Sequence, residues 1–164
     1  MASRDEITDQ MTFLRQKFPT YDSYADASIK DILSPAQLKN SNILTANYLN
    51  TTWFENINGV YTKRSLPIQA QFSPVYAIAV DDFNKDGIMD ILLLGNTEKA
   101  RIKIGKMDAN YGVLLIGQGK GGFKYMDQNI SGLNLKGAIR DVQQLDKGSL
   151  LVTINGQSPV LLKY

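Results

Sequence analysis

The residues of this sequence best suited to chemistry are the oxygen-bearing side chains between positions 82 and 90. Positions 1, 3, 5 and 9 of this nine-residue segment are occupied by Asp82, Asn84, Asp86 and Asp90. Calcium in proteins takes about six to eight oxygen ligands from such side chains and from backbone carbonyls. Gly87 at position 6 permits a sharp turn, and Ile88 at position 7 can offer its backbone carbonyl. The spacing therefore predicts a calcium site.

The flanking residues place this loop between strands rather than helices. Ala77–Val80 and Ile91–Leu94 are short apolar runs typical of strands, and an EF-hand would need a glutamate where this sequence has Leu93. A turn without metal is the alternative, since Asp, Asn and Gly dominate turns. Three carboxylates so close together would repel one another there, which favours a cation. Magnesium is less favoured, because it demands a tighter octahedron and keeps more water.

Helical patterns occupy the first forty residues. Ser3 and Glu6 have capping-box spacing, and Pro19 ends a run with helical periodicity at Ile7, Met11, Leu14 and Phe18. A second helix is expected to start near Asp22 or Ser23, with one apolar face formed by Ala25, Ile29, Ile32 and Leu33. The tetrapeptide Ser34-Pro35-Ala36-Gln37 predicts another helix start, because proline suits the first helical position.

After about residue 46, β-branched and aromatic runs alternate with Asn, Asp and Gly turns, which predicts strands. The expected strands are Tyr48–Glu55, Val60–Ser65, Val75–Val80, Asp90–Leu94, Arg101–Ile104, Tyr111–Ile116, Phe123–Met126, Ile139–Leu145, Ser149–Ile154 and Val160–Lys163. A weak internal repeat relates Val75–Asp82 to Gly137–Val142, and Trp53–Tyr61 to Leu114–Lys124. Its offset of about 60 residues suits one four-stranded blade per repeat.

The predicted fold is therefore mainly β, with an α-helical N-terminal segment and antiparallel blades of β-propeller type. We expect a helical segment over residues 1–45 and a repeat region over residues 46–164. The repeat region would hold a partial blade at 46–72, a full blade at 73–132 and a partial blade at 133–164. So few blades form an incomplete propeller, because closed propellers have about four to eight.

Composition excludes several functional classes. The sequence contains no cysteine and no histidine, which removes the Ser-His and Cys-His nucleophile systems, and no catalytic residue is predicted. The net charge of +2, from 18 basic and 16 acidic residues, implies neither nucleic acid nor an anionic membrane surface as partner. No apolar stretch approaches the roughly 20 residues of a transmembrane helix. The polar start is typical of a cytosolic protein or of a mature domain cut from a precursor.

Three weaker signals have ordinary structural explanations. Gly117, Gly119, Gly121 and Gly122 resemble a phosphate-binding loop, but a strand follows them instead of a helix, which favours a hairpin turn. A basic run is typical of a charged edge strand, with a patch for acidic glycans as the alternative: Lys99, Arg101, Lys103 and Lys106. Four aromatic residues suit packing between blades better than stacking on sugars: Trp53, Tyr61, Tyr111 and Tyr125.

The Asp82–Asp90 loop, entered by Ala-Val-Asp and left by Ile-Leu-Leu-Leu-Gly-Asn, resembles the FG-GAP/VCBS repeat of integrin-like propellers. Leu114–Phe123 is similar to the later hairpin of that repeat, and Phe54–Tyr61 to its counterpart one blade earlier. Ser3-Arg4-Asp5-Glu6, Phe18-Pro19-Thr20-Tyr21 and the segment from Gln69 to Tyr76 resemble the C-terminal part of large bacterial VCBS-repeat proteins. The turn around Asp146 lacks the full ligand set, so no metal site is predicted there.

The resemblance implies an extracellular or cell-envelope location for the exported protein. The expected function is that of a calcium-stabilised, non-catalytic β-repeat module for adhesion, with Ca²⁺ as the cofactor. Its expected partners are a protein or glycan ligand and the remaining blades of a longer precursor. Homodimer formation through exposed sheet edges is a further hypothesis. The alternative is a structural accessory part of a larger propeller enzyme that acts on polysaccharide.

Overall fold

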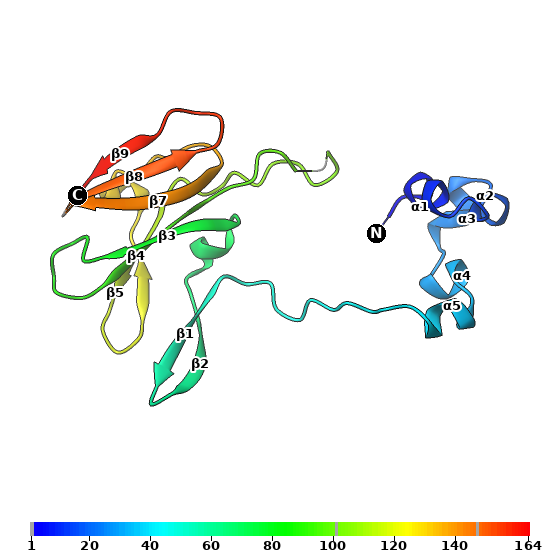
Figure 1. Ribbon diagram of the computed structural model, residues 1–164, viewed down its shortest axis with the longest axis horizontal. Helices are drawn as coiled ribbons and strands as arrows, with labels where there is room; N and C mark the ends of the chain where they lie inside the picture. The colour runs from blue at the N-terminus through cyan, green and yellow to red at the C-terminus, as the bar shows by residue number, and fades with distance from the viewer. Residues whose placement is uncertain (1, 101, 147) are drawn as a thin grey trace. The chain divides into compact units, whose positions relative to one another are not determined.

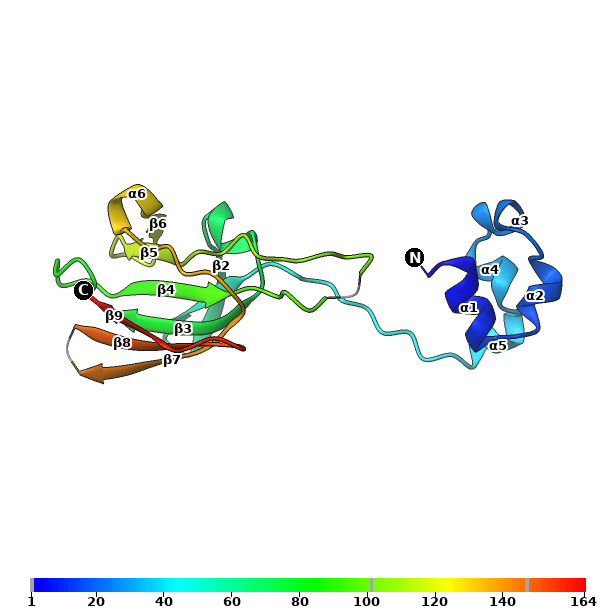
Figure 2. The ribbon, with the colours of Figure 1, turned by 90° about the horizontal axis from the view of Figure 1, so that it is seen from above.

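The computed structural model of the protein describes residues 2–100, 102–146 and 148–164. The chain divides into two compact units, Met1–Asn47 and Tyr48–Tyr164. The first unit is helical, and the second consists mainly of antiparallel strands (Figures 1 and 2). The prediction of a mainly β protein with a helical N-terminal segment is therefore confirmed.

The helices of the first unit are short: α1 (Arg4–Gln10), α2 (Leu14–Lys17), α3 (Tyr21–Ala25), α4 (Ile29–Ile32) and α5 (Pro35–Lys39). The capping boxes predicted at Ser3 and Ser34 are both present. The two longer helices predicted before Ser34 are wrong, because each is divided into two. The bends between the short helices bring Leu14, Phe18 and Ile32 into one buried cluster, so the apolar spacing serves a small core instead of one helix face.

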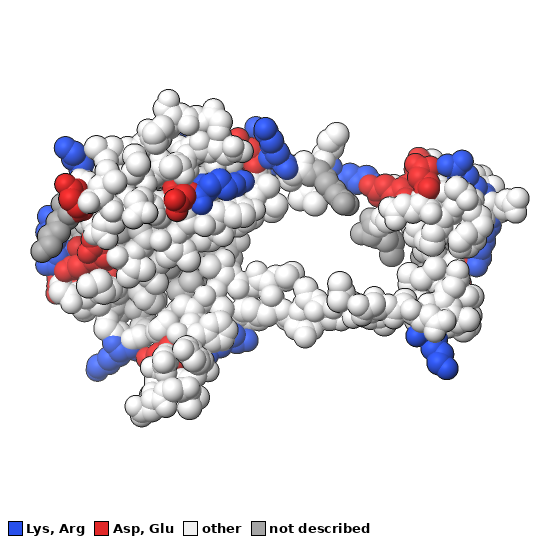
Figure 3. All heavy atoms as spheres, viewed as in Figure 1, with Lys and Arg blue, Asp and Glu red and all other residues white. Residues whose placement is uncertain are grey.

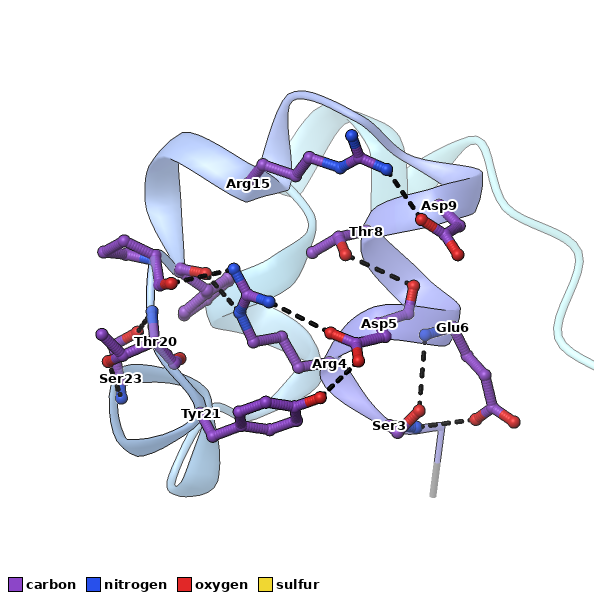
Figure 4. A network of polar contacts seen from close by, with 12 residues as sticks. Ser3, Arg4, Asp5, Glu6, Thr8, Asp9, Arg15, Thr20, Tyr21 and Ser23 are labelled. Carbon is purple, nitrogen blue, oxygen red and sulfur yellow. Dashed lines mark hydrogen bonds and ion pairs between the residues drawn. The ribbon is translucent and has the colours of Figure 1, made fainter.

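Arg4 ties the first helix to the segment between α2 and α3 (Figure 4). Its guanidinium donates to the backbone carbonyls of Phe18, at 2.7 Å from Nε, and of Pro19, at 2.9 Å from Nη2. The Asp5 carboxylate accepts from Arg4 Nη1 at 3.1 Å and from the hydroxyl of Tyr21. One side chain thus binds two consecutive carbonyls, that of the residue capping the end of α2 and that of the next residue.

In the described part of the second unit, the strands form three antiparallel sheets. A two-stranded sheet pairs β1 (Thr52–Ile57) with β2 (Val60–Ser65). A four-stranded sheet has the order β3 (Val75–Asp81), β4 (Asp90–Gly95), β5 (Val113–Gly117), β6 (Phe123–Tyr125). A three-stranded sheet has the order β7 (Ile139–Asp146), β8 (Ser149–Ile154), β9 (Val160–Lys163). Two short elements that the sequence did not predict complete the unit, the 3₁₀ helix η1 (Ile68–Gln71) and the helix α6 (Gln128–Ser131).

Strand β4 lies at the centre of the core. Its Leu92 and Leu94 pack in a cluster that continues into the three-stranded sheet, whereas Leu93 packs on the other face with Ala70 of η1. Both faces of β4 are thus buried, which explains its uninterrupted apolar sequence. Each such leucine contributes about 2 kcal/mol through removal of its surface from water. The first strands of the two larger sheets, β3 and β7, lie side by side (Figures 1 and 2).

The strand predicted at Arg101–Ile104 is wrong for the residues that can be described. Residues 102–104 form a turn, and Arg101 lies outside the described residues. A strand requires a ladder of backbone hydrogen bonds. In the described part of the connection between β4 and β5, one isolated bridge, Thr97 to Met107, provides such pairing. The β-branched residues of this segment favour a strand, but in the described part of the chain the segment has no partner strand with which to form one.

A buried asparagine fixes the end of β4. Asn96 is fully buried and has a φ of +87°, a conformation that asparagine tolerates better than most residues. Its Oδ1 accepts from the Ser73 hydroxyl at 2.8 Å and from the Asn110 amide at 3.0 Å. Its Nδ2 donates to the carbonyls of Asn110, at 2.7 Å, and Gly137, at 3.1 Å. Asn96 therefore joins three segments that are distant in the sequence.

We expect Asn96→Ala to lower the free energy of unfolding by about 3 kcal/mol, because it leaves several buried polar groups without partners. Urea unfolding followed by the fluorescence of Trp53, the sole tryptophan of the sequence, measures this change in the second unit. The control is Asn129→Ala, which truncates an exposed asparagine on α6 and should change stability by less than about 0.5 kcal/mol. Equal stabilities of the two variants would contradict this role for Asn96.

Candidate metal centre

The Asp82–Asp90 segment is a loop between two paired strands, as the sequence predicts. Strands β3 and β4 are antiparallel neighbours, and their register places Asp81 directly opposite Asp90. The loop begins immediately after β3, and its last residue is the first residue of β4. Strand pairing therefore brings the two ends of the loop together.

The side-chain oxygens in the first part of the loop accept hydrogen bonds from the loop's own backbone. The two carboxylate oxygens of Asp82 accept from the amides of Asp86, at 3.0 Å, and Gly87, at 2.8 Å. The Asn84 Oδ1 accepts from the same Asp86 amide at 3.0 Å. The Asp86 Oδ1 accepts from the amide of Ile88 at 2.8 Å. These contacts hold the side chains of Asp82, Asn84 and Asp86 against the amides of residues 86–88.

The backbone of the loop is held in a tight conformation. Gly87 has a φ of +87°, which confirms the sharp turn predicted at this position. Lys85 has a φ of +63°, which costs a residue with a side chain about 1–2 kcal/mol. The Asp86 amide belongs to the peptide unit that follows Lys85. The hydrogen bonds that this amide donates hold Lys85 in its conformation. Asn84 Nδ2 also donates to Asp86 Oδ2 at 2.7 Å, so these two side chains touch.

Asp90 differs from the other predicted ligands in its burial, because its side chain is 0% exposed. Its Oδ2 accepts from the amide of Phe83, within the loop, at 3.0 Å. Its Oδ1 accepts from the amide of Gly117, at the end of β5, at 2.8 Å. Among the described side chains, no lysine or arginine forms an ion pair with Asp90. A carboxylate this deeply buried usually has a cationic partner, because burying an uncompensated charge is costly.

Gly117 is a residue of the site that sequence reasoning assigned only to a hairpin turn. A Cβ atom at this position would lie 2.3 Å from the Met89 carbonyl oxygen and 2.7 Å from Cγ2 of Ile88. A glycine is therefore required for β5 to approach the loop closely enough to donate to Asp90. A single glycine in a glycine-rich turn carries no sequence signal of such a distant contact.

Asp81, one residue before the loop, has partners of its own. Its Oδ1 accepts from the amide of Asp82 at 2.9 Å, and its Oδ2 accepts from Gln144 Nε2 at 2.6 Å and from the Tyr164 hydroxyl. Burial, followed by the hydrogen bond and the negative charge of Asp81, raises the pKa of Tyr164 above its ordinary value of 10.0. The hydroxyl of Tyr164 is therefore a protonated donor at neutral pH.

The weaker sequence signals have mixed outcomes. The glycine run is a hairpin turn between β5 and β6, as predicted, with Gly117 opposite Phe123. The basic run is not an edge strand, because residues 102–104 form a turn. Trp53 packs edge-on against Phe123, with ring centroids 5.5 Å apart, whereas Tyr61 is mostly exposed and does not fill a core. Tyr111 and Tyr125 are half-buried.

The chemistry available elsewhere is limited. Over residues 2–100, 102–146 and 148–164, no three side chains from His, Cys, Asp and Glu lie together in a way that could hold a metal ion. The structure therefore does not gather the predicted ligands Asp82, Asp86 and Asp90 into such a trio. The other two predicted ligands, Asn84 and the Ile88 carbonyl, are of kinds outside that grouping. Basic and acidic side chains are interspersed on the face of the second unit in Figure 3. None of the described helices is long and apolar enough to cross a membrane.

Comparisons of the chain with protein-family models, curated proteins and solved structures found no match. The geometry of the Asp82–Asp90 loop is therefore the basis for the functional argument that follows.

We expect Asp90→Ala to destabilise the second unit by about 3 kcal/mol even in the presence of a chelator, because the amides of Phe83 and Gly117 lose their acceptor. Urea unfolding in excess EDTA, followed by Trp53 fluorescence, checks this. Asp86→Ala is the matched variant from the same loop, and its exposed carboxylate should contribute less than about 1 kcal/mol under these conditions. Equal effects of the two substitutions would show that the buried hydrogen bonds of Asp90 are not structural.

Proposed function

We propose that the Asp82–Asp90 loop binds Ca²⁺ and that the chain is a calcium-stabilised, non-catalytic β-repeat module of an exported bacterial protein. The observation that carries the proposal is the buried Asp90 carboxylate, which lacks a cationic partner among the described residues and contacts the loop through the Phe83 amide. The oxygens of Asp82, Asn84 and Asp86 lie on the same loop. Calcium prefers this type of donor set.

Backbone amides alone leave the charge of the loop uncancelled. Each carboxylate of the loop accepts hydrogen bonds from backbone N–H groups, which orient it. These donors are neutral, so the segment keeps three negative charges against the single positive charge of Lys85. A carboxylate offers about four lone-pair sites, so an oxygen that accepts one amide can still coordinate a cation. When bound, Ca²⁺ would supply the missing positive charge and replace the hydrogen bond from Asn84 to Asp86.

The repeat character of the fold rests on the relation between the two larger sheets. Each is a consecutive antiparallel meander, and their first strands β3 and β7 lie side by side. Propellers repeat such antiparallel meanders around a central axis, so two consecutive meanders in one chain support the resemblance to FG-GAP repeats. On β3, alternate side chains are about half exposed: Tyr76, Ile78 and Val80. Such an apolar stripe suits contact with further blades of a precursor or with a protein or glycan ligand.

An exported location agrees with the proposed chemistry. Extracellular calcium modules bind with dissociation constants of about 10⁻⁴–10⁻³ M, which matches external calcium and far exceeds the cytosolic level. Calcium at about ten times a dissociation constant of 10⁻⁴ M would stabilise the native state by about 1.4 kcal/mol. The proposed role of the ion is therefore to stabilise the folded module outside the cell.

Thermal unfolding of the wild type and of Asp86→Ala, each with 1 mM CaCl₂ and with EDTA, tests this function. We expect calcium to raise the midpoint of the wild type by about 5 °C and that of Asp86→Ala by less than about 1 °C. Asp108→Ala, which removes an exposed aspartate outside the loop, should respond like the wild type. Magnesium at the same concentration should have a smaller effect.

A wild-type midpoint that does not change with calcium would show that the loop is an ordinary turn. An equal calcium response of wild type and Asp86→Ala would place the ion elsewhere. Either result would remove the basis for the calcium-stabilised module.

A further inference from the structure

The residue before the Asp82–Asp90 loop is held by side chains from the three-stranded sheet. The Asp81 Oδ2 accepts from the hydroxyl of Tyr164, which is 83 residues away in the sequence. The same oxygen accepts from Gln144 Nε2, on β7, at 2.6 Å. The β7–β9 sheet therefore contacts β3 at the point where the loop begins.

Tyr164 also contacts the second residue of the loop. Its ring packs edge-on against the ring of Phe83, with centroids 4.7 Å apart and an interplanar angle of 70°. The amide of Phe83 in turn donates to Asp90 Oδ2. Tyr164 thus contacts both sequence neighbours of Asp82, which is the first proposed ligand. The orientation of the Asp82 backbone depends on both neighbours.

Tyr164 is itself anchored in the three-stranded sheet. Its amide donates to the Gly148 carbonyl at 3.1 Å, and it directly follows β9, which pairs with β8 from Ser149 to Val152. Gln144 Nε2 lies 3.3 Å from the Tyr164 hydroxyl, so these two side chains, which both donate to Asp81 Oδ2, also contact each other. Any shift of the sheet relative to β3 would therefore move Asp81 and Phe83 together.

We propose that Tyr164 is a positioning residue for the calcium loop, through which the three-stranded sheet sets the affinity of the loop for Ca²⁺. This inference rests on the proposed calcium function and names a second part of the molecule that regulates the same site. Coupling between two sites is reciprocal. Calcium binding must accordingly strengthen the attachment of β9 to β3 by the same free energy that the attachment contributes to binding.

Isothermal titration calorimetry with CaCl₂ on the wild type and on Tyr164→Phe measures the coupling. Phenylalanine keeps the ring contact with Phe83 and removes the hydrogen bond to Asp81. We expect the dissociation constant to rise about tenfold, the size of effect found when a residue that orients a metal ligand is removed. Tyr61→Phe, which removes the hydroxyl of an exposed tyrosine on β2, should leave the dissociation constant unchanged.

Hydrogen exchange provides a readout that a merely structural role of Tyr164 would not produce. In the wild type, calcium should slow exchange at the amides of β8 and β9 as well as in the loop. In Tyr164→Phe, saturating calcium should slow exchange in the loop only. Gln144→Ala, which removes the second donor to Asp81, is the independent variant and should weaken calcium binding in the same direction.

The possible failures are distinguishable. A wild type that shows no heat of calcium binding would overturn the calcium site and this inference with it. A wild type that binds calcium with the same dissociation constant as both Tyr164→Phe and Gln144→Ala would overturn the inference alone. Loop-only protection in the wild type would do the same, since reciprocity requires an effect on the sheet.

Discussion

The buried carboxylate of Asp90 is the constraint on which the rest of the second unit depends. One carboxylate oxygen accepts from the loop that precedes β4, and the other accepts from the end of β5, 27 residues later in the sequence. A single side chain therefore sets the spacing between the β3–β4 loop and the β5–β6 hairpin. Because the carboxylate is fully buried, this spacing cannot relax toward water without leaving two amides unpaired.

Two glycines allow backbone segments to approach each other closely near the two ends of β4. At Gly117 a side chain would collide with the Met89 carbonyl, and at Gly95 a Cβ would lie 1.8 Å from the Pro74 carbonyl oxygen. Gly95 is the last residue of β4, so both ends of this central strand touch backbone of another segment directly. The buried leucines between them then pack on both faces without gaps at the strand ends.

Patterns of adjacent residues in the sequence predicted several local features of the structure. The capping residues Ser3 and Ser34, the turn at Gly87 and the hairpin after Gly117 each depend on a few adjacent residues, and the structure contains them all. The division of the first helices was missed because the apolar spacing is equally compatible with short helices around a common core. The contact of Tyr164 with Asp81 was missed for a different reason. It joins residues 83 positions apart, and no periodicity or motif encodes a pairing over that distance.

Two buried polar side chains of the second unit differ in a way that locates the proposed ion. Asn96 is neutral, and its four hydrogen bonds to Ser73, Asn110 and Gly137 satisfy both its donor and its acceptor within the chain. Asp90 has equally well-placed donors, yet two neutral amides cannot cancel a full negative charge in a medium of low polarity. Asp82 and Asp86 add two more charges on the adjoining loop. The asparagine network is therefore complete without a further partner, whereas the loop would gain from the proposed positive ion, for which oxygen donors favour calcium over softer metals.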